Sequence, residues 1–111
     1  MRHGEVWIVD FEPSIGEEIT KTRPAVIVNN DKVGALALRV VVPITDVGKF
    51  VQPWQVGITS NQTNNLNKDS LVDCFQLKSL SEKRFRRRIG SLSPDEMSEI
   101  KAAIAAVLDL I

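Results

Sequence analysis

Two blocks of this sequence read Lys21-Thr22-Arg23-Pro24-Ala25-Val26-Ile27-Val28 and Val41-Val42-Pro43-Ile44-Thr45. Each contains a continuous apolar run, as expected of strands that are buried on both faces. Pro24 favours an extended conformation at Arg23, which therefore lies in a stiff segment just before its strand. Thr45 mirrors it after the end of the next run. Two rigid strand ends of this kind can hold a cation and a hydroxyl together, an arrangement suited to a phosphate group.

A simpler interpretation competes with a phosphate site. An arginine beside a proline is usually a surface charge, and a threonine that follows a strand is usually part of a turn. The choice between the two interpretations depends on the rest of the chain.

Length and composition indicate one small globular unit. The chain has 111 residues, which fits a single domain spanning residues 1–111 with a core of its own. No apolar run is long enough to span a bilayer, and the first residues lack the apolar region of a signal peptide. Cys74 is the only cysteine, which excludes an internal disulfide framework. These features predict a soluble protein of a reducing cytoplasm.

The residue types present do not favour metal or nucleotide chemistry. One histidine, His3, and one cysteine cannot build an ordinary zinc site, and no carboxylate cluster has the spacing of a cation-binding loop. The chain also lacks a glycine-rich phosphate loop. We therefore expect no metal and no cofactor, so that catalysis would use Arg, Thr, Ser, Asp, Glu or His3.

Charge is balanced overall and uneven locally. The formal net charge is +0, so global charge does not predict a nucleic-acid partner. Basic residues are concentrated between positions 83 and 88, and the only acidic residue beside them is Glu82. This basic run is interpreted either as a solvated face or as a phosphate-binding stripe. Because strand residues alternate, Arg86 and Arg88 are expected on one side of it and Arg87 on the other. The run comprises Lys83, Arg84, Arg86, Arg87 and Arg88.

Alternating apolar residues and turn signals predict about six strands. In the first, residues 5–11, we expect Val6, Ile8 and Phe11 to point inward, with Trp7 and Val9 on the other face. The exposed loop at 12–22 that follows is long for so small a domain, which favours a functional role. The later strands are expected up to residue 28 and at 36–42, 54–59, 70–78 and 85–90, with a polar loop at 60–69 and one helical turn at 81–84.

The C-terminal segment predicts a helix. Ser93 and Glu96 form a capping box, and Pro94 occupies the first helical position. Apolar residues then recur at helical spacing to the end of the chain, and this stripe favours core packing or a dimer surface. They are Met97, Ile100, Ile104, Val107, Leu108 and Ile111.

These elements predict a mainly β fold with one C-terminal helix. Many short strands and a terminal helix are typical of a strongly bent sheet or small barrel with the helix packed across it. Barrels of this size carry function on the loops at their rim.

Several blocks of the sequence, in order, resemble the MazF/PemK/Kid toxins, the mRNA endoribonucleases of bacterial toxin–antitoxin pairs. The similarity runs nearly from end to end. The blocks are residues 2–7, 9–13, 16–18, 22–28, 42–45, 68–70, 76–79 and 89–92, followed by the helix start at Ser93.

The resemblance implies an SH3-like barrel of the MazF/Kid/CcdB type. It also implies a homodimer with single-stranded RNA lying along a composite groove. A small MazE-like antitoxin, whose disordered tail occupies the same groove, would inhibit it. These properties come from the resemblance and not from composition or periodicity.

The resemblance places the catalytic arginine at Arg23 and the catalytic threonine at Thr45. The RNA 2′-OH is the nucleophile and is already held beside the scissile phosphorus, so no activated water is needed. The Arg23 guanidinium is suited to stabilise charge on the phosphoryl oxygens, and Thr45 would add a neutral donor. The expected products are a 2′,3′-cyclic phosphate, or its opened form, and a 5′-hydroxyl.

The sequence departs from the family pattern at the proton-transfer position. Several relatives carry Asp or Glu immediately before the residue aligned with Gln76, whereas this chain has Phe75. Asp73 and Glu18 are the candidate acids or bases, and His3 or a solvent acceptor stays open. Phe75 is read either as a stacking platform for a base or as a core residue, and general burial tendencies favour the core. In a continuous strand, Asp73 would share its face.

The remaining site predictions concern RNA contacts and sequence preference. We expect the loops at 46–53 and 60–69 to contribute to base recognition. The asparagine-rich second loop has a plainer interpretation as a soluble connection. Cys74 is read as a small packed residue. The residues expected to bind RNA are Lys21, Thr22, Phe75, Gln76, Lys78, Arg86 and Arg88.

Two other functions stay open at this stage. CcdB-like toxins have a similar barrel and dimer, but they act by binding DNA gyrase and catalyse no reaction, and fold alone does not separate the two classes. A catalytically weak relative that binds an antitoxin is the other alternative, and Phe75 is the reason to retain it. The pair Arg23 and Thr45 favours the nuclease.

Overall fold

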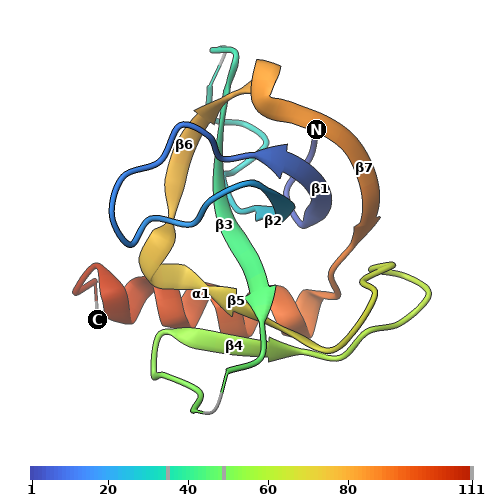
Figure 1. Ribbon diagram of the computed structural model, residues 1–111, viewed down its shortest axis with the longest axis vertical. Coiled ribbons are helices and arrows are strands. Elements are labelled where there is room, and N and C mark those ends of the chain that lie inside the picture. Colours follow the sequence, from blue (N-terminus) through green and yellow to red (C-terminus); the bar gives the residue numbers. More distant parts are fainter. Residues whose placement is uncertain (35, 49, 111) are drawn as a thin grey trace.

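The computed structural model describes residues 1–34, 36–48 and 50–110. In these ranges the chain forms a seven-stranded antiparallel sheet that curls into a barrel, two short 3-10 turns and one helix (Figure 1). The elements are β1 (Glu5–Asp10), β2 (Thr22–Ile27), β3 (Leu38–Asp46), β4 (Gln55–Ile58), β5 (Ser70–Asp73), η1 (Cys74–Gln76), β6 (Lys78–Ser81), η2 (Glu82–Arg84), β7 (Phe85–Ser91) and α1 (Pro94–Val107).

The long strand β3 organises the sheet. The strand order is β4-β5-β3-β2-β1-β7, and β6 pairs with β3 outside this path. β3 pairs with β6 through residues 38–41 and with β5 through residues 44–46, while residues 41–43 pair with β2. Helix α1 crosses the lower part of the view in Figure 1 and packs against β4 and η1.

The central strands are buried on both faces, as their continuous apolar runs predict. Val26 packs in a first core with Ile100 of α1, whereas its neighbours Ala25 and Ile27 pack in a second core inside the barrel. Burial on both faces excludes water from the β2–β3 pairing and fixes the ends of these strands rigidly.

The first strand is buried differently from the prediction. Val9 and Phe11 lie in the second core with Trp7 at its margin, and Ile8 is only half-buried. Phe11 therefore shares the face of Trp7 and Val9, not that of Val6. Strand alternation puts odd residues on one face, and both faces of this strand meet a core.

The predicted fifth strand at 70–78 is wrong as a continuous element. The 3-10 turn η1 separates β5 from β6, and the Asp73 carboxylate accepts a hydrogen bond from the Phe75 N–H at 3.1 Å. This capping interaction stabilises the turn and ends the strand alternation. Cys74 is therefore fully buried while Phe75 is exposed.

The terminal helix begins as predicted. Ser93 accepts from the Glu96 N–H, Glu96 accepts from the Ser93 N–H, and Pro94 opens the helix. Met97 and Ile100 are buried, but the helix ends at Val107 rather than continuing to the chain end. Ile104 and Val107 pack at the margin of the first core, Leu108 is exposed, and Ile111 lies outside the described residues. None of the described helices is long and apolar enough to cross a membrane.

Hydrogen bonds hold the polar loop at 60–69 in a defined conformation. Asn64 is fully buried, where its amide donates to the Thr59 carbonyl at 2.9 Å and accepts from the Leu66 N–H at 3.0 Å. The Ser91 N–H of β7 donates to the Thr63 carbonyl. The loop is therefore folded around the buried Asn64 amide and joined to β7 by a backbone hydrogen bond.

Candidate active site

Arg23 and Thr45 lie at the same end of neighbouring strands. β2 and β3 pair with Ala25 opposite Pro43 and Val26 opposite Val42. This pairing ends at Ala25 and Pro43, and Arg23 and Thr45 each lie two residues further towards the same end of the sheet. Residues two apart along a strand share a face. Both residues therefore extend the barrel-interior face of β2 and β3 to its rim, where each is half-buried.

The Arg23 guanidinium is held on one side only. Its Nε donates to the Thr20 carbonyl oxygen at 3.0 Å. Within the part of the chain that the structure describes, Arg23 forms no ion pair. Its two Nη groups are thus available to donate a pair of hydrogen bonds to an anion.

The β1–β2 loop, which contains Thr20, is fixed by residues from the η1–β6 segment. It lies beside β6 in Figure 1. The Ile19 N–H donates to Gln76 Oε1 at 2.6 Å, Gln76 Nε2 donates to the Glu17 carbonyl at 3.2 Å, and Lys78 Nζ pairs with Glu18 at 2.9 Å. Gln76 and Lys78, both predicted to bind RNA, therefore also hold the loop on which Arg23 rests.

Glu18 is a poor proton acceptor in this arrangement. The hydrogen bond from Lys78 and the backbone hydrogen bond from Ile15 hold the pKa of Glu18 below its usual value. A lower pKa makes the carboxylate a weaker base.

Phe75 lines an open pocket of about 670 Å³ beside this loop. Its side chain is 66% exposed and meets Trp54 edge to face, with ring centroids 5.5 Å apart. The preference for a core role is therefore wrong, because the 3-10 turn rotates Phe75 out of the strand alternation. Sequence reasoning missed Trp54 as its partner, although a bulky aromatic directly after Pro53 was a usable signal. The pocket is lined by Ile15, Glu17, Glu18, Trp54, Asp73, Phe75, Gln76, Leu77 and Lys78.

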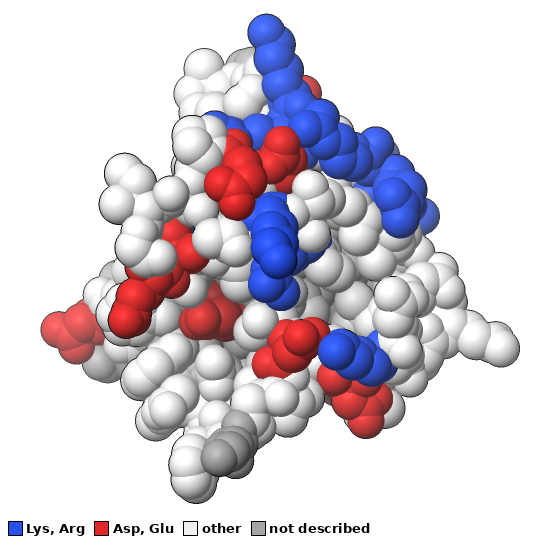
Figure 2. Space-filling model, in the orientation of Figure 1, with Lys and Arg blue, Asp and Glu red and all other residues white. Residues whose placement is uncertain are grey.

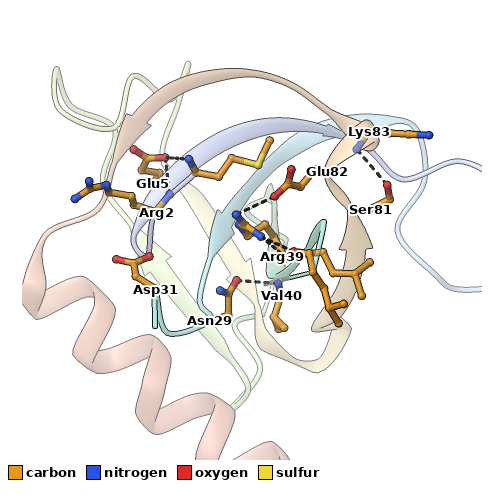
Figure 3. A network of polar contacts seen from close by, with 12 residues as sticks. Arg2, Glu5, Asn29, Asp31, Arg39, Val40, Ser81, Glu82 and Lys83 are labelled. Carbon is orange, nitrogen blue, oxygen red and sulfur yellow. Dashed lines mark hydrogen bonds and ion pairs between the residues drawn. The ribbon is translucent and has the colours of Figure 1, made fainter. Parts of the chain in front are cut away.

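Asp73 and His3 occupy different ends of the molecule. Asp73 lines the pocket, with one carboxylate oxygen bonded to the Phe75 N–H. His3 lies at the opposite end of β2 from Arg23, where its Nδ1 is 3.2 Å from the Asn29 carbonyl oxygen. Figure 3 shows the polar network at that end, in which Asn29 accepts from the Val40 N–H and Arg39 pairs with Glu82. The structure does not bring His3 to the site.

Cys74 is structural. It is fully buried, and this burial raises the pKa of its thiol to about 11. A thiol with so high a pKa is not a nucleophile near neutral pH. The expectation of a small packed residue is therefore confirmed.

Basic side chains gather over η2 and β7, along the upper right edge of Figure 2. Arg86 pairs with Asp10 at 2.8 Å and Arg88 pairs with Glu5 at 3.1 Å. The register with β1 shifts between Arg87 and Phe85, which leaves Arg86 as an extra residue. Simple alternation therefore does not apply, and all three residues from 86 to 88 are exposed.

Arg86 is the closer of the two ion-paired arginines to Arg23. Both Phe85 and Arg23 pair with Val9 of β1, whereas Arg88 pairs with Trp7, towards the other end of that strand. Position along β1 therefore favours Arg86 over Arg88 for a role beside Arg23.

Lys21 and Thr22 join the loop to β2 and are exposed. Lys21 has a positive φ of 65°, and its N–H donates to the Glu12 carboxylate at 2.8 Å. This turn directs the chain into β2 immediately before Arg23. In residues 1–34, 36–48 and 50–110, no group of three or more His, Cys, Asp or Glu side chains is placed to hold a metal ion.

Comparison with known proteins identifies relatives over the whole chain. The chain is 38% identical over 116 residues to endoribonuclease MazF9 of Mycobacterium tuberculosis, covering 99% of this chain and 98% of the relative. It is 33% identical to endoribonuclease MazF of Staphylococcus epidermidis, covering 99% and 92% of the two chains.

Solved structures share the fold. MazF from Deinococcus radiodurans superimposes with a TM-score of 0.84 at 20% identity, covering 98% of this chain and 96% of that one. A mycobacterial endoribonuclease solved in complex with its cognate antitoxin gives a TM-score of 0.79 at 20% identity, covering 100% and 97%. The mainly β architecture with a C-terminal helix is therefore that of MazF toxins.

The family model of the PemK-like, MazF-like toxins matches residues 2–108. This match covers both strand ends of the candidate site and all the elements of the sheet. The chain therefore belongs to the PemK-like, MazF-like toxins of type II toxin–antitoxin systems and, with relatives such as these, to the MazF-type endoribonucleases.

Proposed function

We propose that this toxin cleaves single-stranded mRNA at selected sequences without a metal ion, using Arg23 and Thr45. The observation that carries the proposal is the position of these two residues at one end of β2 and β3. The Nη groups of Arg23 are not engaged in an ion pair with any described residue. A guanidinium and a hydroxyl on rigid strand ends suit a phosphate that gains charge in the transition state.

The reaction uses the RNA's own 2′-hydroxyl. The 2′-hydroxyl gives its proton to a base while its oxygen forms a bond to the adjacent phosphorus, the bond from phosphorus to the 5′-oxygen breaks, and the leaving oxygen takes up a proton from an acid. A 2′,3′-cyclic phosphate and a 5′-hydroxyl result. Arg23 stabilises the phosphoryl oxygens, and Thr45 donates one further hydrogen bond.

Of the two candidate carboxylates, we favour Asp73 for proton transfer. Glu18 is committed to Lys78 and has a lowered pKa, whereas Asp73 lines the open pocket and uses one oxygen to cap η1. We assign Asp73 the proton-transfer role in place of the acid that relatives carry at position 75.

The pocket around Phe75 supports binding of an unstacked base. Exposed aromatic rings bind bases by stacking, and every base offers a face for this contact. Phe75, backed by Trp54, provides such a ring at a pocket whose rim carries Gln76 and Lys78. Exposed Lys21 and Thr22 precede Arg23, so they are candidates for contacts to the neighbouring phosphates.

Two solved neighbours support a proposal about partners. A mycobacterial endoribonuclease and MazF from Deinococcus radiodurans have been solved with their antitoxins, the latter named MazE. We propose a MazE-like antitoxin for this toxin, together with a homodimer in which RNA lies along a groove shared by both copies.

The test is incubation of the purified protein with a long unstructured RNA in excess EDTA. Arg23→Ala should abolish discrete cuts that carry 5′-hydroxyl ends. Arg87→Ala is the matched control, since it removes an exposed arginine that pairs with no other described residue. Cleavage by Arg23→Ala at the wild-type rate, or cleavage that EDTA stops, would overturn the proposal. Intact RNA with the wild-type protein would instead favour a binding toxin, which a gyrase inhibition assay detects.

A further inference from the structure

The oxygen and the nitrogen of the Gln76 side-chain amide both form hydrogen bonds with the backbone of residues 17–19. Oε1 accepts from the Ile19 N–H at 2.6 Å, and Nε2 donates to the Glu17 carbonyl at 3.2 Å. Gln76 is half-buried and is the last residue of the 3-10 turn that Asp73 caps, so its own position is fixed. A primary amide is the side chain that can donate and accept in this way.

The clamped segment leads directly to the candidate catalytic arginine. Thr20 follows Ile19 in the chain, and its carbonyl oxygen accepts from Arg23 Nε at 3.0 Å. Ile19 itself is buried in the second core, which fixes the side of the segment that faces the barrel. The orientation of the Thr20 carbonyl, and with it the plane of the guanidinium, depends on the backbone that Gln76 holds.

We propose that Gln76 is a positioning residue, which orients Arg23 through the backbone of residues 17–20. The inference rests on the proposed role of Arg23. With Nε tied to Thr20, the two Nη groups are left to face the phosphate as a fixed pair. Charge stabilisation requires donors that are already oriented, and a displacement of about 1 Å can cost about 100-fold in rate.

Lys78 does not replace this clamp. Its bond to Glu18 joins two side chains that are 23% and 43% exposed, and partly exposed ion pairs hold geometry weakly. Gln76 holds the backbone itself. We therefore expect the loss of Gln76 to reorient Arg23 even while the pair of Lys78 and Glu18 persists.

The first test needs no substrate. In the free protein, the exchange rate of the Arg23 Nε–H with solvent is measured by NMR, and the signal is assigned by its loss in Arg23→Lys. Gln76→Ala should speed this exchange about five- to tenfold, the scale of one lost hydrogen bond. Gln55→Ala is the matched control, because the Gln55 side-chain oxygen accepts a hydrogen bond from the Gln52 N–H in a different loop. An unchanged Arg23 signal in Gln76→Ala would overturn the proposal.

The second test separates positioning from direct contact with RNA. Positioning predicts that Gln76→Ala lowers kcat about 10- to 100-fold and leaves KM within about twofold. In an Arg23→Lys background, the same substitution should lower kcat by less than about twofold, because its effect passes through Arg23. A raised KM with unchanged kcat, or an equal loss in both backgrounds, would assign Gln76 to RNA binding instead. Full activity of Arg23→Ala would refute the proposed function, while the exchange measurement would still test the clamp.

Discussion

At the scale of single residues, the candidate chemistry depends on one charged and one neutral donor. Arg23 provides a positively charged donor, and Thr45 provides a hydroxyl on the neighbouring strand. The proton-transfer step has to be supplied separately, and Asp73 is the residue that we propose for it in a chain that carries Phe75.

Removing only the Thr45 hydroxyl should slow the chemical step. Thr45→Val keeps the shape of the side chain, so we expect a loss of about 100-fold in single-turnover cleavage, the scale of one donor to developing charge. Thr45→Ser keeps the hydroxyl and should stay within about tenfold of wild type. Equal rates for the Val and Ser variants would show that the hydroxyl is not used.

Glu18 should contribute to stability above its usual pKa of 4.5 and lose that contribution in acid. Its pKa is lower in the folded protein, so the contribution is present above 4.5 and disappears as pH falls through the folded value. Glu18→Gln should therefore lose less stability than wild type between about pH 5 and 3 in urea unfolding. Glu17→Gln is the control, and a steeper acid loss in Glu18→Gln would contradict the assignment.

At the scale of elements, the strands and the helix lie close to their predicted positions where short-range sequence signals decide them. Pro24, the apolar runs of β2 and β3 and the capping box at Ser93 each act over a few residues, and each element formed where these signals lie. The far ends differed: β3 runs to Asp46 and includes Thr45, because its last residues pair with β5, and α1 stops at Val107. The segment at 70–78 differed from the prediction. Its backbone could either continue as a strand or turn into a 3-10 helix capped by Asp73, and the spacing of apolar residues does not distinguish these two hydrogen-bond patterns.

The contact between β7 and the loop at 60–69 requires a glycine. A Cβ added at Gly90 would lie 2.7 Å from the Asn64 carbonyl carbon and closer still to the Thr63 oxygen. We expect Gly90→Ala to lower the free energy of unfolding by about 1–3 kcal/mol, because a backbone contact has to open. Gly57→Ala on β4 is the control, since nothing lies within 4 Å of its added Cβ. Equal midpoints in urea unfolding would refute the close contact.

At the scale of the whole molecule, charge balance makes RNA binding a local property. The net charge is +0, so attraction to RNA depends on where the cations lie. Figure 2 shows them concentrated over β7 and η2, with acidic groups close by. Arg86 could exchange Asp10 for a phosphate, because both groups of this pair are solvent-accessible.

The salt dependence of RNA affinity tests this exchange. If Arg86 contacts one phosphate, Arg86→Ala should reduce the slope of log affinity against log salt by about 0.7, the value per contact for single strands. Arg88→Ala should change the slope less, given its position towards the other end of β1. Lys101→Ala on α1 is the control, and an unchanged slope for Arg86→Ala would remove Arg86 from the RNA site.

The sequence by itself determined the strands β2 and β3, the capped helix, and Arg23 and Thr45 as the residues to consider. These features depend on proline geometry, burial on both faces and capping, all of which act between near neighbours. The tertiary structure alone decided that Phe75 is exposed against Trp54 and that Gln76 holds the loop under Arg23. The two Gln76 hydrogen bonds join residues 57 and 59 positions apart, and they form only when the barrel closes and brings β6 beside the β1–β2 loop.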